Sequence, residues 1–357
     1  MGKLKIILTV DYEVSGDGSG SVDSCIIDPA ERMMQLCEKY NAKLTFFTDV
    51  CEYWAFKEVK ESGKYEDGLD PANKITNQIK DIYRRGHDIQ LHLHPQWIDY
   101  KYMGNNNWIL NMEFWRLPNV KLLGENAIYN LFERGKNTLE KIISEVNPNY
   151  CCDVFRAGAL CIQPEEEILK VMQQLNFKIE SSVTVGVKFN DGKTIYDFTN
   201  AIDDLPEWNI LNNLQSFNKN GLIKEVPIFT AKVPFIKDIK FAILRMLRKI
   251  NSNKIECKQD LKKNSKTSIL FRVYRSIKSK RRRFSFGDEN SFEELKYMTK
   301  KAKIKYQALS KTKDVPIVMI SHTKTFGNGK EFEKYLRWAN KKEYIEFSNF
   351  HFLKNNE

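Results

Sequence analysis

The hydrophobic and polar positions along the chain form short apolar runs that alternate with longer periodic ones. Short runs rich in β-branched and aromatic residues predict buried strands, and longer runs with apolar residues three to four positions apart predict helices. The strands are expected at 5–11, 42–50, 88–94, 152–158, 177–185, 222–229 and 316–322. The helices are expected at 29–40, 72–85, 126–146, 164–176 and 330–342.

This alternation of strands and helices predicts an α/β fold with a mostly parallel sheet, and the number of such units favours a barrel. The segment 95–124 interrupts the pattern, because it is long, aromatic and irregular. Such a segment is typical of a substrate loop at the mouth of a barrel.

The charge is distributed unevenly, although the chain of 357 residues as a whole carries a net charge of +11. Residues 232–283 contain 18 lysines and arginines against three acidic residues, so that the rest of the chain is slightly acidic. We therefore predict a body formed by residues 1–231 and 290–357, which is interrupted by a basic insertion at 232–289.

Residues 235–250, inside the insertion, have apolar residues at helical spacing with basic residues between them. The apolar face of this helix would consist of Phe235, Ile236, Ile239, Ile243, Leu247 and Ile250. An amphipathic basic helix either packs on the body, lies on anionic lipid or contacts nucleic acid. We expect peripheral contact of residues 235–283 with an anionic membrane. Nucleic acid is the poorer candidate, because no aromatic-rich recognition motif accompanies the charge.

The sequence also bears on the cellular compartment. The first apolar run is too short for a signal peptide, and no run approaches the roughly 20 apolar residues of a membrane-spanning helix. The seven cysteines lack C-x-x-C spacing, which favours free thiols in a reducing compartment. We therefore expect a cytoplasmic protein that is held at the inner face of the membrane by its basic segment.

Three of the five histidines lie in one stretch that ends with the sequence HLHP. Alternate side chains of a strand share a face, so His92 and His94 point to the same side. Pro95 ends the strand directly after them. His87 falls on the apolar side of the strand and is interpreted as a structural residue.

The first strand places two acidic residues in the same way, because Asp11 and Glu13 share one face. In a barrel, both pairs would face inward at the carboxyl ends of their strands, where barrel enzymes keep their active sites. Two imidazoles and one carboxylate suit a divalent metal, most of all zinc, and the second carboxylate is then free to act as a base. A single inward histidine is more often a core residue, but two histidines with two acids favour a metal site.

Five segments in this order resemble the polysaccharide deacetylase family of metal-dependent carbohydrate esterases. These segments are LTVDYE, AKLTFF, GHDIQLHLHP, FRAG and ISHTKTF, and the resemblance covers about residues 4–230 and 290–330. The resemblance implies a distorted barrel of about seven β/α units. It also implies an enzyme that removes acetyl groups from N-acetylated sugars with a bound divalent metal.

The resemblance implies roles for individual residues. Asp11 matches the general base, and His92 matches the first metal histidine. Arg156 matches the arginine that orients the base, and His322 matches the histidine that protonates the leaving amine.

The chain departs from the family pattern at two metal ligands. Tyr12 stands where the family has a second aspartate, and Gln96 stands where it has the second histidine. Strand periodicity nominates Glu13 as the carboxylate ligand, and His94 is the next histidine. The candidate substrate-binding residues are Tyr12 and Trp97.

We therefore expect a zinc-dependent hydrolase that deacetylates an N-acetylated sugar or glycan, including a lipid-linked one, during cell-surface polysaccharide biosynthesis. Two alternatives stay open. A non-catalytic carbohydrate-binding relative would follow if Tyr12 marks a lost site. A cupin-like metal protein would share the H-x-H ligand pattern, although that fold is all-β.

Overall fold

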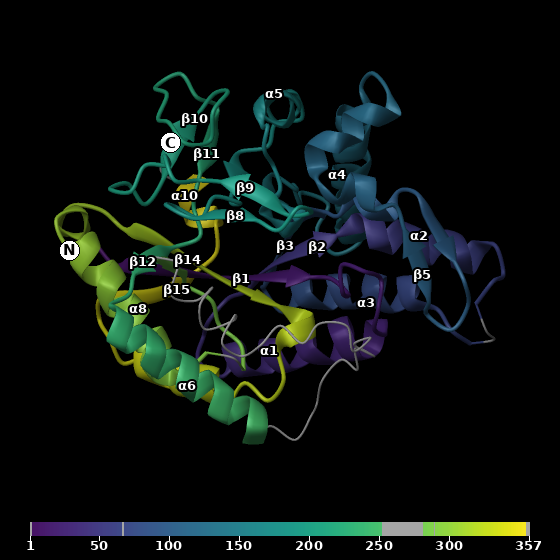
Figure 1. Cartoon of the computed structure of the whole chain (residues 1–357). Coiled ribbons are helices and arrows are strands. Elements are labelled where there is room, and N and C mark those ends of the chain that lie inside the picture. The colour runs from purple at the N-terminus through teal and green to yellow at the C-terminus, as the bar shows by residue number, and fades with distance from the viewer. Residues whose placement is uncertain (1, 66–67, 252–280, 289, 355–357) are drawn as a thin grey trace.

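The computed structural model describes residues 2–65, 68–251, 281–288 and 290–354, and of residues 245–251 it describes the backbone only. Its centre is a sheet in which neighbouring strands are mostly parallel (Figure 1). The parallel strands of the barrel are β1 (Leu4–Tyr12), β2 (Thr45–Asp49), β3 (Asp88–Leu93), β6 (Val154–Ala157), β7 (Ile179–Glu180), β11 (Ile223–Glu225) and β14 (Val315–His322).

The sheet curls until its two sides meet. Just beyond β11, Ile228 forms parallel bridges with Thr184, which follows β7, and with Val318 of β14. Since β14 also pairs along the whole of β1, these bridges close a distorted barrel. The prediction of an α/β barrel is confirmed, and this fold excludes the all-β cupin alternative.

Helices surround the strands on the outside of the barrel (Figure 1). They are α1 (Asp28–Glu38), α2 (Val50–Glu61), α3 (Pro71–Arg84), α4 (Ala127–Ser144), α5 (Glu166–Gln174), α8 (Phe292–Lys305), α9 (Lys330–Ala339) and the short α10 (His351–Lys354). Several begin at a side chain that accepts a hydrogen bond from a free backbone N–H. Asp49 caps α2, Asp70 caps α3 and Ser291 caps α8.

Three of these helices, α2, α8 and the short α10, were not among the predicted elements. Helix α2 buries residues on nearly all of its faces, because it packs against α3, α4 and the segment after β3. A helix covered on several sides loses the one-sided apolar pattern that identifies surface helices in a sequence.

Further short strands extend the large sheet or form separate two-stranded sheets. They are β4 (Tyr100–Tyr102), β5 (Trp108–Leu110), β8 (Lys188–Asn190), β9 (Ile195–Asp197), β10 (Trp208–Ile210), β12 (Thr230–Lys232), β13 (Arg281–Arg283) and β15 (Ile345–Ser348). The segment 95–124 is less irregular than expected. It contains the β4–β5 hairpin and the short helical turns η2 (Pro95–Trp97), η3 (Met112–Trp115) and η4 (Leu117–Leu123).

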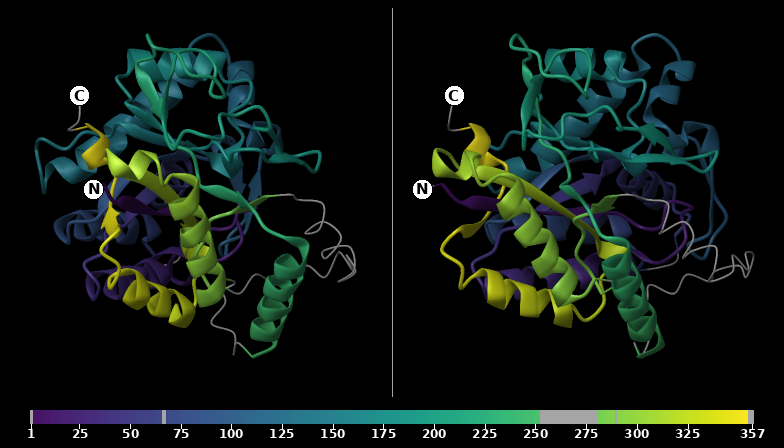
Figure 2. Two further views of the ribbon diagram at one scale, coloured as in Figure 1. Left: turned by 90° about the vertical axis from the view of Figure 1, so that its left-hand side faces the viewer. Right: turned by 60° about the vertical axis from the view of Figure 1, so that its left-hand side comes forward.

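The predicted basic helix is α6 (Phe235–Asn251), which lies at the outside of the molecule (Figure 2). It is fastened to the body by the buried ring of Phe241, which packs on Tyr297 of α8, and by an ion pair between Asp238 and Arg282. The side chains of Leu247 and Ile250, and all of residues 252–280, lie outside the described residues. None of the helices that the structure describes is long and apolar enough to cross a membrane.

The chain rejoins the body earlier than the predicted boundary at residue 290. Strand β13 pairs with β12, and the residues that follow it, Phe284 and Phe286, are buried in the core. Phe284 and Phe286 therefore belong to the core of the body, whereas Arg282 of β13 pairs with Asp238 of α6.

Candidate metal centre

The register of the parallel strands brings the predicted site residues to one level of the barrel. Strand pairing sets Asp11 beside His322 and His92 beside Arg156. Each of these residues lies at or near the carboxyl end of its strand. Residues separated by up to about 300 positions in the chain therefore meet at one end of the barrel, where this fold places its functional groups.

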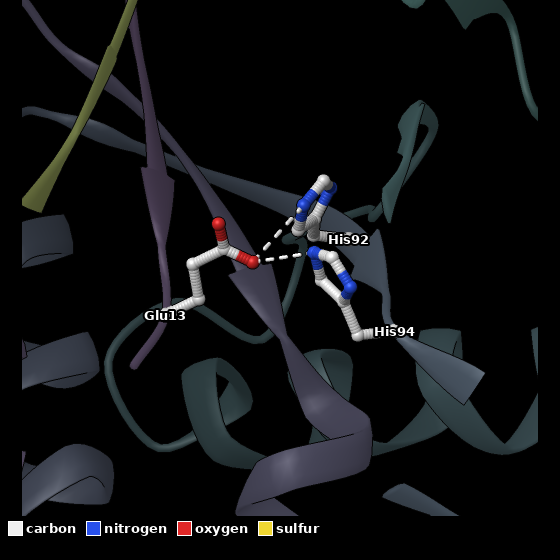
Figure 3. A group of neighbouring side chains, drawn as sticks. All are labelled: Glu13, His92 and His94. Carbon is white, nitrogen blue, oxygen red and sulfur yellow. Dashed lines mark ion pairs between the residues drawn. The ribbon is translucent and has the colours of Figure 1, made fainter. Parts of the chain in front are cut away.

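Glu13, His92 and His94 form a buried group of three potential ligands (Figure 3). Oε2 of Glu13 lies 2.5 Å from Nε2 of His94 and 3.6 Å from Nε2 of His92. All three ligand atoms lie within 4.8 Å of one another, as they must to bind one ion. A group of this composition suits zinc and similar divalent metals.

The hydrogen bonds of the two imidazoles support this interpretation. Nδ1 of His92 lies 2.8 Å from the carbonyl oxygen of Arg156, to which it can only donate, so the lone pair of Nε2 is free to bind a metal. Nε2 of His92 is buried and makes no hydrogen bond to any described residue, and Nε2 of His94 is buried 2.5 Å from Oε2 of Glu13. A buried nitrogen without a hydrogen bond is costly unless something else binds it, so the residues present fit a divalent metal.

Gln96, which stands where the family pattern has a histidine, does not belong to the ligand group. Its amide lies 3.1 Å from Nδ1 of His94. When Nε2 of His94 binds a metal, Nδ1 carries the proton, and the Gln96 amide can turn its oxygen toward it. In the structure the amide nitrogen faces Nδ1 and also donates to the carbonyl oxygen of Gly16 at 3.3 Å. With the amide turned, Gln96 would orient His94 for metal binding.

Asp11 lies next to this group and is held by Arg156. The guanidinium donates to Oδ1 of Asp11 at 2.9 Å and also to the carbonyl oxygen of Ser181 at 2.9 Å. Burial alone would raise the pKa of Asp11, but the charges of Arg156, His92 and His322 together outweigh this effect and lower the pKa below its ordinary value. Asp11 is therefore an anion at neutral pH.

His322 lies on the other side of Asp11, with Nε2 3.4 Å from Oδ2 of Asp11 and 4.0 Å from Oε1 of Glu13. Its side chain is 35% exposed, against 5% for the side chains of Asp11 and Glu13, so His322 lies at the opening of the site. Loss of solvent around the ring lowers the pKa of His322 although Asp11 raises it, so the ring is neutral at pH 7.

The two candidate substrate-binding residues do not line the site. Tyr12 is 1% exposed, and its hydroxyl donates to Gln78 of α3 at 2.7 Å, because the alternation along β1 turns it toward the helices. Trp97 is 2% exposed, since the turn η2 carries its ring onto Phe56 of α2. We therefore correct both assignments.

A different tryptophan, Trp115 of η3, contacts the site. The centre of its ring lies 5.9 Å from that of His94. Its Nε1 donates to Thr194 at 3.0 Å, and the ammonium group of Lys193 lies 3.2 Å from the ring centre. Nothing in the local sequence distinguishes Trp115 from Trp97, because both belong to the same aromatic segment.

Sequence reasoning also missed three charged residues around Glu13. Lys324 donates to Oε1 of Glu13 at 2.7 Å. Oδ1 of Asp49, at the end of β2, accepts from the backbone N–H of His94 at 3.1 Å. Both carboxylate oxygens of Glu52 lie 3.1 Å from the backbone nitrogen of Val14. Asp49 could have been found, because it lies one residue before the end of a predicted strand, and Asp11 lies at the end of another.

The fold and this site together define an α/β barrel protein with a candidate divalent-metal centre at the carboxyl ends of its strands. No family model matches the chain, and no curated protein does. Solved structures resemble it over nearly its whole length, and among them are polysaccharide deacetylases, the family that the sequence motifs resemble.

Three of these structures illustrate the degree of similarity. A candidate polysaccharide deacetylase from Mycobacterium smegmatis has a TM-score of 0.49 and 10% identity, over 99% of this chain and 90% of the other. A probable polysaccharide deacetylase from Pseudomonas aeruginosa PAO1 has a TM-score of 0.46 and 13% identity over the same shares. The α-amylase AmyC from Thermotoga maritima has a TM-score of 0.49 and 8% identity, over 99% and 75%. Similarity at this level says nothing about the reaction, which has to be argued from the site.

Proposed function

We propose that this protein is a metal-dependent hydrolase that removes the acetyl group from an N-acetylated sugar. The observation that carries the proposal is the short distance from His322 to both Glu13 and Asp11. Glu13, which belongs to the ligand group, lies 4.0 Å from His322, and His322 lies 3.4 Å from Asp11. A metal-binding group, a base and a proton donor therefore lie next to one another.

Glu13, His92 and His94 would hold the metal, which when bound supplies a Lewis acid and lowers the pKa of a water molecule toward about 7. Asp11 is anionic because Arg156 pairs with it, so it can accept the proton of the attacking water. His322 is within reach of Asp11 and lies at the opening of the site. Its ring can pass the proton to the amine nitrogen as the carbon–nitrogen bond breaks. The products are acetate and the free amino sugar.

The finer parts of the proposal are supported by the sequence motifs and by the ligand chemistry. Histidine and carboxylate ligands favour zinc among the divalent metals. The motifs resemble those of a family that acts on polysaccharides, and we propose a role in cell-surface polysaccharide biosynthesis at the cytoplasmic side of the membrane.

The proposed function predicts metal-dependent acetate release. Purified protein is expected to contain a stoichiometric divalent metal and to release acetate from at least one member of a panel of N-acetyl sugars, nucleotide sugars and lipid-linked glycans. A chelator should abolish the release, and zinc should restore it. The enzymatic proposal is wrong if the protein binds glycans but neither takes up zinc nor releases acetate. That result would identify a non-catalytic carbohydrate-binding protein.

We further propose that α6 contacts an anionic membrane. Phe235, Ile236 and Ile243 are exposed on this helix, with Ile236 81% exposed, and Lys240 supplies an exposed positive charge. Exposed apolar side chains beside basic ones are typical of helices that lie in the plane of a membrane surface.

Replacing Ile236 and Ile243 together by glutamate is expected to weaken binding to vesicles with anionic lipid by about tenfold or more, because two apolar contacts are lost and two negative charges are gained. Co-sedimentation with such vesicles measures the effect. Leu222→Glu is the control, because Leu222 is 69% exposed and directly precedes β11, a strand that Figure 1 shows on the side of the molecule away from α6. Equal binding by the double variant and the wild type would contradict the proposal.

A further inference from the structure

Lys324 occupies a position inside the candidate metal centre that the proposed reaction does not use. It lies in the turn η7 (Thr323–Thr325), directly after β14. Its ammonium group donates to Oε1 of Glu13 at 2.7 Å and to the backbone carbonyl oxygen of Val14 at 3.0 Å. The side chain is largely buried, with 18% of its surface exposed.

The two oxygens of Glu13 have separate partners. Oε1 accepts from Lys324, whereas Oε2 faces the two histidines, 2.5 Å from His94 and 3.6 Å from His92. A carboxylate can bind a metal through one oxygen or through both. An ammonium group held on Oε1 competes with a metal for that oxygen.

The position of the ammonium group is set by the two residues that directly follow β1. Val14 follows Glu13 in the chain, so the carbonyl oxygen that Lys324 binds and the carboxylate that it binds belong to adjacent residues. The contact therefore fixes the side chain of Glu13 relative to its own backbone, in the way that groups behind a metal ligand orient it.

We propose that Lys324 is a positioning residue that restricts Glu13 to binding the divalent metal through one oxygen. This inference rests on the proposed metal centre. With only Oε2 available, the three ligands leave room on the metal for water and substrate, as a catalytic metal site requires. Lys324 also compensates the charge of the buried Glu13 whenever no metal is bound.

A purely structural role is the competing explanation, in which the ion pair only fastens the turn η7 to β1. The two explanations differ in what happens to the metal. Loss of a structural ion pair lowers the stability of the protein and leaves the coordination of the metal unchanged. Loss of the restriction on Glu13 changes the number of oxygen ligands.

The test uses the full chain loaded with Co²⁺, whose visible absorption weakens as its coordination number rises. Lys324→Met is expected to lose absorption intensity, because Oε1 of Glu13 becomes free to bind the ion. Lys324→Arg keeps a cation on Oε1 and should keep the wild-type spectrum. Lys324→Gln, whose side chain is too short to reach Glu13, should behave as the methionine variant does. It replaces the methionine variant in the test if Lys324→Met fails to fold.

The matched control is Lys39→Met, since Lys39 also pairs with a glutamate at 2.7 Å, but on the surface with Glu333. A wild-type spectrum in folded Lys324→Met and Lys324→Gln would overturn the inference, as would an equal loss of intensity in Lys39→Met. If the wild-type protein takes up no Co²⁺ at all, the proposed metal centre is itself wrong. The two failures are therefore distinguishable.

Discussion

Replacing Asp11 by asparagine is expected to lower kcat for acetate release by about 10²–10⁴-fold, the range that a general base contributes. The substitution removes the negative charge that accepts the proton of water but keeps the shape of the side chain. The amide oxygen can still accept from Arg156, which lies 2.9 Å from Asp11. KM is expected to change little, because no substrate contact is removed.

The metal content of Asp11→Asn should stay that of the wild type, since Asp11 is not one of the three proposed ligands, Glu13, His92 and His94. Asp314→Asn is a suitable control. Asp314 directly precedes β14, where it pairs with Lys5 at 3.1 Å, at the opposite end of the same strands. Full activity of Asp11→Asn would refute the assignment of the base, and loss of the metal would show that Asp11 is a ligand instead.

Replacing Arg156 by methionine is expected to lower the free energy of unfolding by about 3–5 kcal/mol, the usual cost of removing one partner of a buried ion pair. Arg156 is fully buried, and its loss leaves the carboxylate of Asp11 without the cation that compensates it. The guanidinium also lies 4.2 Å from the ring centre of Phe47 and donates to Ser181. Urea unfolding followed by circular dichroism measures the change.

Two further variants test whether the uncompensated charge causes the loss. Arg134→Met removes an exposed pair with Glu58 and should change the free energy of unfolding by about 1 kcal/mol or less. The double variant Asp11→Asn with Arg156→Met should recover part of the lost stability, because the buried negative charge is gone. Arg156→Met with wild-type stability would mean that Asp11 is solvated or protonated in the folded protein.

The sequence alone was enough to place the main groups of the site on the correct face of their strands. The alternation along β1 turns Asp11 and Glu13 to one side and Tyr12 to the other, and the structure confirms these directions. The same alternation turns His92 and His94 inward. It holds even where a strand has ended, since Glu13 and His94 lie one residue beyond β1 and β3.

Predictions from the sequence were weaker where a residue lies in a turn. Trp97 and Trp115 belong to one aromatic segment, but the turn η2 buries the first against Phe56, whereas η3 brings the second to His94. Lys324 likewise follows the end of β14, and the turn η7 directs it back to Glu13. The side chains of a turn do not alternate with a regular period as those of a strand do. Their directions therefore depend on the packing around them.

The amino-acid sequence by itself indicated the seven parallel strands, most of the longer helices and the face of each strand that carries the acids and histidines, because these follow from periods of two and 3.6 residues. Only the tertiary structure decided that Ile228 closes the barrel, that Asp11 meets His322 and that Lys324 reaches Glu13. These contacts join segments up to about 300 residues apart. They depend on strand register and turn geometry, which are set by the packing of the whole chain rather than by any local pattern.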